Sequence, residues 1–185
     1  MQKSFLLFLI LLSAFCTNAQ ITRNNWMVGG NGHISFQRET HLNFLVKGTE
    51  IVISPDVGYF IIDKLAAGAR LTYSSNRIRY NSIDSKTRSI AGGPFLRYYF
   101  LSSDNRINLL SETALQFFHY FSDRGSSDDD GSIELSAGPV IYFNTSVGIE
   151  LLANYKIFFN SPSEGVQDIR RFSLGIGLQI HLEKE

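Results

Sequence analysis

The side chains that could do acid–base or metal chemistry in this chain are few and scattered. The four histidines lie far apart in the sequence, at His33, His41, His119 and His181. No two of them have the His-x-x-x-His spacing that presents two imidazoles to one zinc ion. Three consecutive aspartates at 128–130 offer oxygen ligands, but calcium-binding loops place their carboxylates at alternate positions. We therefore expect a solvated acidic loop at 128–130, and neither a metal site nor a cofactor.

His119 is the histidine whose sequence neighbours could complete a catalytic set. Ser111 lies eight residues earlier. Along an extended strand that is a separation of about 26 Å, too far for a nucleophile and its base. Ser122 or Asp123 would be close enough for a His/Ser/acid set. His119 also stands among the four aromatic residues of 117–121, which favours an interfacial position, and we expect no catalytic residue.

The elements that would position these residues are strands, and the clearest runs from Phe172 to Leu182. Large apolar residues alternate there with glycine, serine, glutamine and histidine. Side chains on a strand point alternately to its two faces, so this segment has one apolar face and one small or polar face. A tilted strand needs about 9–11 residues to cross a bilayer, which this segment supplies. The pattern predicts a membrane-crossing strand.

Seven further segments repeat this alternation, and no amphipathic helix competes with them. The predicted strands cover 26–37, 49–60, 66–75, 88–101, 107–121, 132–143, 147–159 and 169–182. Long connections are expected at 38–48, 76–87, 122–131 and 160–168, and short ones at 61–65, 102–106 and 144–146. Long outer loops and short periplasmic turns are typical of transmembrane barrels. The sequence therefore predicts an all-β, eight-stranded, antiparallel up-and-down transmembrane β-barrel with both ends on the periplasmic side.

If the apolar faces contact lipid, eight charged residues point into the barrel. They are Asp56, Arg70, Arg97, Glu112, Glu134, Glu150, Lys156 and Arg171. An eight-stranded barrel has room inside for side chains and little else, and unpaired buried charges are costly. Since these eight residues are half acidic and half basic, we expect a lumen filled by salt bridges, with a narrow pore or proton path as the alternative.

Three prolines, Pro55, Pro94 and Pro139, fall inside predicted strands. Proline removes a donor from the sheet ladder and usually marks an edge or a bulge. All three are on the lipid-facing phase of even-numbered strands. We therefore expect bulges or kinks near one rim.

Residues 1–19 have the features of a secretory signal peptide. Lys3 precedes an apolar run that ends with Phe15, and small or polar residues lead to Ala19, where cleavage is expected. A lipoprotein signal also ends at a cysteine, but the bulky Phe15 stands before Cys16 where such signals carry small residues. Cys16 is the only cysteine, so the mature domain, 20–185, would have no disulfide. The 17 basic and 17 acidic residues balance, which argues against a nucleic-acid partner.

Three stretches carry a resemblance to a known family. They are the strand–turn–strand from Ser54 to Gly68, the strand from Gly93 to Phe100, and the terminal Gly175 to Leu178. On these residues the mature chain resembles the outer-membrane β-barrel domain family, the small OmpA/OmpX-like barrels of Gram-negative bacteria. The resemblance implies insertion into outer-membrane lipid by the barrel-assembly machinery. Such barrels usually end on an aromatic residue that aids recognition by the assembly machinery. Here Leu182 is followed by residues 183–185, Glu-Lys-Glu, so we expect less efficient assembly.

We therefore expect a non-enzymatic barrel of the Gram-negative outer membrane, with a structural role in the envelope or an interaction role carried by its outer loops. The protein or surface ligand that the loops would contact is not identified by the sequence. Three alternatives stand beside this hypothesis. The first is an enzyme that modifies lipids of the outer leaflet, with a site around His119. The second is a narrow channel, and the third is a soluble lipocalin-like carrier whose apolar face would turn inward around a ligand.

Overall fold

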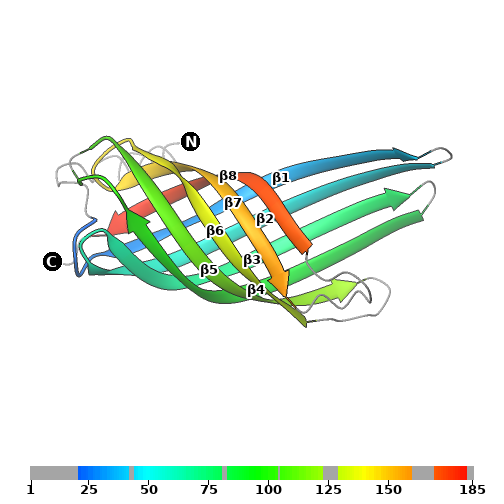
Figure 1. The fold of residues 1–185 in the computed structure, drawn as a ribbon, viewed down its shortest axis with the longest axis horizontal. Coiled ribbons are helices and arrows are strands. Elements are labelled where there is room, and N and C mark those ends of the chain that lie inside the picture. Colours follow the sequence, from blue (N-terminus) through cyan, green and yellow to red (C-terminus); the bar gives the residue numbers. More distant parts are fainter. Residues whose placement is uncertain are drawn as a thin grey trace, which may run out of the picture.

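The computed structural model describes residues 21–41, 44–80, 83–103, 105–122, 129–159 and 169–182 (Figure 1). Eight strands form a closed antiparallel barrel in which each strand pairs with its sequence neighbours and β8 pairs with β1. They are β1 (Trp26–His41), β2 (Phe44–Ile62), β3 (Leu65–Tyr80), β4 (Ile83–Tyr99), β5 (Ile107–Ser122), β6 (Asp129–Tyr142), β7 (Val147–Phe159) and β8 (Ile169–Leu182). The predicted eight-stranded up-and-down barrel is confirmed. The predicted signal peptide, Cys16 included, lies outside the described residues.

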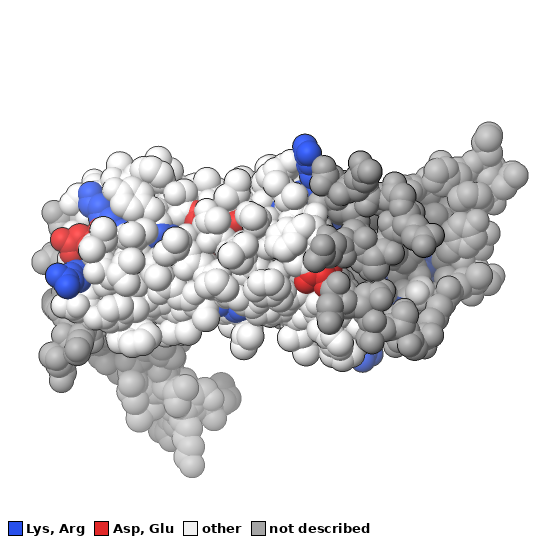
Figure 2. All heavy atoms as spheres, turned by 60° about the horizontal axis from the view of Figure 1, so that its bottom comes forward, with Lys and Arg blue, Asp and Glu red and all other residues white. Residues whose placement is uncertain are grey.

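Apolar side chains occupy the outside of the barrel, as the alternation predicts. In β8, Phe172, Leu174 and Ile176 are 67%, 71% and 64% exposed, whereas Gln179 is fully buried. Every other strand also carries exposed large apolar residues, which together form a belt. Figure 2 shows one face of this belt as mostly uncharged, with a group of charged side chains at the left end. A lipid-facing surface has this distribution. Among the described residues, no helix is long and apolar enough to cross a membrane.

The first four strands extend further at one end than predicted. Most of the loop expected at 38–48 is strand, because β1 continues to His41 and β2 begins at Phe44. The loop expected at 76–87 is likewise mostly strand, since β3 runs to Tyr80 and β4 starts at Ile83. Beyond a lipid layer both faces of a sheet meet water, so pairing can continue after the apolar alternation has ended. The prediction of two long loops here was wrong.

Among the described strands, this part of the sheet has no neighbour on either side. Pairing of β1 with β8 stops at Gly32, and pairing of β4 with β5 begins only at Thr87. We call residues 33–41, 44–52, 77–80 and 83–86 the four-stranded extension. In Figure 1 the corresponding ends of β1 to β4 stand well beyond the ends of β5 to β8. The end of the barrel that carries the extension is called the mouth, and the opposite end the base.

The three prolines do not shift the strand register. Pro55, Pro94 and Pro139 are each aligned with a residue of the preceding strand. Toward the following strand the ladder is interrupted around each proline and then resumes in the same alignment. The missing N–H is thus accommodated by a local gap in the ladder. The predicted bulges were wrong, and the register shift in β2 lies instead between Phe60 and Ile62.

The base is finished by the segment that precedes β1. Asn24 N donates to the Phe60 carbonyl at 2.9 Å, and Lys64 N donates to the Ile21 carbonyl at 2.8 Å. Ile21 is buried and packs in the apolar cluster of the base together with Met27 and Phe60. Lys64 has a left-handed backbone (φ 67°), as the predicted tight turn between β2 and β3 requires. The chain thus supplies its own cover at this end.

Candidate functional site

The charged residues of the lumen form one buried network. Arg70 of β3 and Arg97 of β4 lie at its centre, each 1% exposed. Both contact Glu112 of β5: Arg70 Nη1 is 2.5 Å from Oε1, and Arg97 Nη2 is 2.7 Å from Oε2. Arg70 Nη2 donates to Asp56 Oδ2 at 2.7 Å, and Arg97 Nη1 donates to Glu150 Oε1 at 2.6 Å. The network therefore links β2, β3, β4, β5 and β7 across the lumen.

Strand register explains half of this network. Asp56 is aligned with Arg70 on the neighbouring strand, and Arg97 is aligned with Glu112. Residues directly opposite each other on one face of an antiparallel pair have Cβ atoms about 4.5–5.5 Å apart, within reach of an ion pair. The contact from Arg97 to Glu150 is different, because β4 and β7 are not neighbours. It forms across the lumen and depends on closure of the barrel.

A phenylalanine ring lies against both arginines. Phe95 is buried, and its ring centroid is 5.3 Å from Arg70 Cζ and 5.5 Å from Arg97 Cζ. Cations at this distance from an aromatic ring are attracted to its π face. The ring reaches toward β3 over Gly68, where a Cβ would stand 2.6 Å from Phe95 Cζ. Glycine at this position is therefore needed for the ring to keep its place against the arginines.

Below the arginines, toward the base, the lumen is filled by aromatic and amide side chains. Tyr99 Oη donates to Gln179 Oε1 at 2.5 Å, and Gln179 Nε2 donates to Tyr142 Oη at 3.0 Å. His181 lies edge-on to three rings, with centroid distances of 5.4 Å to Phe60, 6.0 Å to Tyr99 and 5.7 Å to Tyr142. Among the described side chains, neither of its ring nitrogens has a hydrogen-bond partner. His181 therefore packs as an aromatic ring.

Above the arginines, toward the mouth, a second polar layer crosses the lumen. Lys156 Nζ is 2.7 Å from Glu134 Oε2, its aligned partner on β6, and 3.3 Å from Gln116 Oε1. Gln116 Nε2 donates to Thr72 Oγ1 at 3.0 Å. Lys156 Nζ also stands 5.2 Å from the centre of the Phe118 ring. These contacts join β3, β5, β6 and β7 above the central network.

The structure thus places the eight predicted inward charges as follows. Six are buried, Lys156 is half-buried, and Arg171 is exposed at the mouth. Among the described residues, no group of three His, Cys, Asp or Glu side chains could hold a metal ion. Each buried carboxylate of the network has an arginine or lysine within ion-pair distance, and such paired groups hold strands together. The chemistry available to this network is that of a structural plug.

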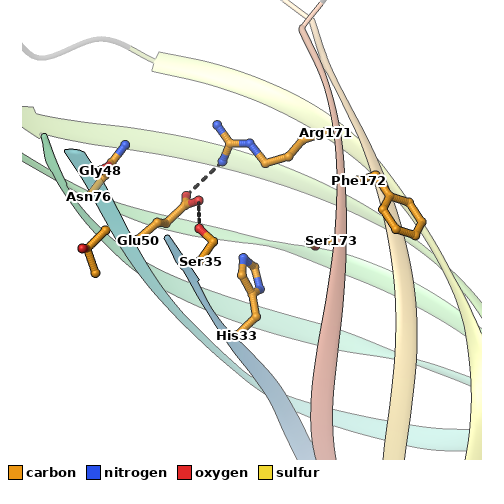
Figure 3. A pocket seen from close by; sticks show the side chains of 9 residues that line it. His33, Ser35, Gly48, Glu50, Asn76, Arg171, Phe172 and Ser173 are labelled. Carbon is orange, nitrogen blue, oxygen red and sulfur yellow. Dashed lines mark hydrogen bonds and ion pairs between the residues drawn. The ribbon is translucent and has the colours of Figure 1, made fainter. Parts of the chain in front are cut away.

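A pocket of about 260 Å³ opens at the mouth, between β1 and β8 (Figure 3). Arg171 reaches from β8 across the pocket and donates from Nη1 to Glu50 Oε1 of β2 at 2.9 Å. Ser35 Oγ of β1 donates to Glu50 Oε2 at 3.3 Å. The imidazole of His33 and the hydroxyl of Ser173 complete the part of the lining nearest the seam. The pocket is therefore polar inside, with Arg171 and Glu50 as a charge-neutral pair.

Sequence reasoning selected eight charged residues for the lumen, and so it missed several residues that the structure places inside the barrel. Each missed residue has the inward phase of its strand; Glu50, for example, precedes the lipid-facing Ile51. The inward position in the strand alternation was therefore the signal that could have identified these residues from the sequence. The missed residues are Glu50, Tyr99, Gln116 and Tyr142.

The four histidines do not converge on one site. His33 lines the pocket and His181 is buried near the base, whereas His119 is exposed on β5, edge-on to Phe121 at 4.7 Å. The side chain of His41 is outside the described part of the structure, and so are those of the candidate partners of His119, Ser122 and Asp123.

The acidic run at 128–130 is only partly a loop. β6 begins at Asp129, and Asp129 and Asp130 are aligned with residues of β5. Asp130 is 9% exposed, and its Oδ1 accepts the N–H of Gly131 at 2.7 Å. The predicted solvated loop is thus wrong for Asp130, because strand pairing continues into the acidic run. Asp128 lies outside the described residues.

Comparisons with known proteins identify the fold and nothing narrower. No family model matches the sequence, and no curated protein matches it either. Neisserial surface protein A (NspA) has a similar structure, with a TM-score of 0.57 and 17% identity over 84% of this chain and 96% of that protein. The outer membrane protein OprG from Pseudomonas aeruginosa gives a TM-score of 0.58 and 11% identity over 88% of this chain and 98% of OprG. This chain has the fold of the small eight-stranded outer-membrane β-barrels.

Proposed function

We propose that this protein is exported by its N-terminal signal and resides in the outer membrane of a Gram-negative bacterium, where it has a structural or interaction role and no catalytic one. One observation carries the proposal. An apolar belt covers the outside of the barrel while ion-paired charges fill the inside. Charges in the lumen are paired and shielded, and the belt requires lipid, so this distribution suits a bilayer.

The same observation weighs against a soluble lipocalin-like carrier. A carrier of that kind would turn its apolar face inward around its ligand. Here Arg70 and Arg97 occupy the middle of the lumen, and the large apolar side chains of β8 are on the outside. A soluble monomer rarely exposes a continuous apolar surface of this extent. The belt is therefore assigned to outer-membrane lipid, into which the barrel-assembly machinery would insert the chain.

We place the interaction role in the four-stranded extension. Within the described part of the chain the extension has two open edges, one along β1 beyond Gly32 and one along β4 before Thr87. Backbone groups on an open edge can pair with another chain, and charged residues on the edge limit unwanted pairing. Both edges carry such residues, including Arg38, Glu39 and Asp84. A protein or another ligand at the cell surface would meet this sheet first.

The plugged lumen favours this role over a narrow channel. The central network and the layer above it cross the lumen at two levels, and the side chains of Arg70, Asp56 and Glu112 are completely shielded from solvent. An ion would have to break several charge-assisted contacts to pass. An enzyme that modifies outer-leaflet lipids would need a set of groups around His119, and no observation favours it over the plugged barrel.

The test uses the full chain expressed in a Gram-negative host. Outer-membrane fractions are run on a gel with and without boiling, and intact cells are treated with trypsin before the same analysis. We expect a mobility shift on boiling in the outer-membrane fraction, and tryptic cleavage within the extension while the barrel stays intact. Protein recovered from the periplasm without detergent and without a shift would refute the membrane assignment. A shifted band whose extension is cut only in lysed cells would refute the orientation.

A further inference from the structure

The seam between the first and last strands is paired over only part of its length. The ladder runs from Trp26, aligned with Leu182, up to Gly32, aligned with Ile176. Both strands continue toward the mouth, β1 to His41 and β8 back to Ile169. The same register would align Ser35 with Ser173, but no pair forms there. The barrel is therefore open along β1 and β8 above Gly32.

The lower end of the opening, next to Gly32, borders the apolar belt. On its outer side stand Ile34 of β1 and Phe172 and Leu174 of β8, all of them among the most exposed apolar residues of the barrel. Backbone N–H and C=O groups next to lipid need a hydrogen-bond partner, because the hydrocarbon offers none. An occupant of the opening would thus need polar groups for the strand edges and an apolar portion for the surrounding lipid.

The inner side of the opening is the pocket at the mouth. Arg171 and Glu50 are joined to each other across it, and Ser35 is bonded to the same carboxylate. His33 and Ser173 add neutral groups that donate and accept hydrogen bonds. Since the two charges cancel, the pocket offers no net charge to a ligand. Its volume is about 260 Å³.

The pocket ends inside the barrel. Below it, the layer of Lys156, Glu134 and Gln116 crosses the lumen, and the arginine network follows. The pocket is therefore closed toward the base, and it borders the mouth and the unpaired seam between β1 and β8. This geometry is that of a binding site shared between the lumen and the membrane.

We propose that the open seam binds an amphiphile with an uncharged, hydrogen-bonding head group. The head group occupies the pocket beside Ser35, His33 and Ser173, and the apolar tail passes between β1 and β8 to lie along Phe172 and Leu174. A monoacylglycerol has this chemistry: two hydroxyls and an ester on one acyl chain. This inference goes beyond the proposed structural or interaction role, and it requires neither a partner protein nor catalysis.

The test uses the full-length protein carrying Cys16→Ser and Ser173→Cys, purified folded and reconstituted in phosphatidylcholine nanodiscs. The probe is monooleoylglycerol with a photoreactive diazirine in its acyl chain. The thiol introduced by Ser173→Cys is blocked after folding with a bulky maleimide, so the block cannot affect folding. A matched protein carries Leu96→Cys, blocked in the same way, at an exposed position of β4. Labelled peptides are mapped by mass spectrometry.

We expect saturable labelling of the peptides that contain Ile34 and Phe172. Blocking the thiol in the Ser173→Cys protein should weaken the apparent affinity at least about ten-fold, which corresponds to about 1.4 kcal/mol. Blocking the thiol in the Leu96→Cys protein should leave the affinity unchanged. Labelling spread around the belt, or the same affinity before and after the block in the pocket, would overturn the proposed site. Better competition by oleate or lysophosphatidylcholine than by unlabelled monooleoylglycerol would overturn the uncharged head group.

Discussion

Replacing Arg97 by glutamine tests whether the buried network stabilises the barrel. Arg97 is ion-paired with Glu112 at 2.7 Å and with Glu150 at 2.6 Å. Glu112 would keep Arg70 as a partner in the variant. Glu150 would not keep one, because Arg97 is the only cation within ion-pair distance of it among the described side chains. The substitution therefore leaves one buried carboxylate without a counter-charge.

The expected cost follows from that unpaired carboxylate. Removing one partner of a buried ion pair costs about 3–5 kcal/mol. With an m-value of about 2 kcal/mol per molar urea, a loss of about 4 kcal/mol lowers the unfolding midpoint by about 2 M. Adding Glu150→Gln removes the stranded charge. The double variant should therefore be less destabilised than the sum of the single ones, with a coupling free energy of about 1–3 kcal/mol.

The measurement is urea unfolding in lipid vesicles, followed by the mobility difference between folded and unfolded barrel. Arg171→Gln is the matched control, because the Arg171–Glu50 pair is partly exposed and such pairs contribute only about 0–1 kcal/mol. The reasoning is refuted if Arg97→Gln shifts the midpoint no more than Arg171→Gln. It is also refuted if the loss of unfolding free energy in the double variant equals the sum of the losses in Arg97→Gln and Glu150→Gln.

Three further predictions concern packing, lipid contact and conduction. Gly93→Ala should lower the free energy of unfolding by about 1–3 kcal/mol, because a Cβ there would overlap the Leu115 carbonyl. Gly92→Ala is the control: there is room for its methyl group, so its free energy of unfolding should change by no more than about 0.5 kcal/mol in the same urea assay. Ile176→Arg should lower the yield of folding into vesicles and reduce the free energy of unfolding by about 2–4 kcal/mol, the value for a lipid-facing arginine at the bilayer midplane. Leu182→Arg, at the base, should reduce it by at most about 1 kcal/mol. Planar bilayers containing the protein should show no single-channel steps, and regular steps would contradict the plugged lumen.

The division between outside and inside could be predicted from the sequence because it repeats every second residue. β8 shows this best: Leu174 and Ile176 face outward and Gln179 faces the lumen, as the alternation predicts. The inward position of Arg70 and Glu112 follows from the same rule. For a membrane barrel the rule is strict, since a slip by one residue would bring charges into lipid.

The ion-pair partners across the lumen and the ends of the strands could not be predicted in the same way. The contact of Arg97 with Glu150 depends on closure of the barrel, which no local pattern encodes. The strands of the extension lose their alternation where water replaces lipid on both faces, so the pattern ended before the strand did. The open seam above Gly32 concerns which backbone groups pair, and side-chain periodicity carries no information on that. Pro139 shows the converse, since a residue that usually breaks pairing is accommodated here without a shift.

The alignment of Trp26 with Leu182 means that the first and last strands finish side by side at the base. In such a closed ring of strands the chain could begin at a different strand without changing the shape of the barrel. A short linker from the end of β8 to Ile21 would keep the segment that covers the base, and new ends could be opened between β1 and β2 at the tip of the extension. A circularly permuted chain of this kind should close into the same barrel. Affinity tags or display peptides could then be carried at the mouth, on the side of the membrane opposite the natural ends.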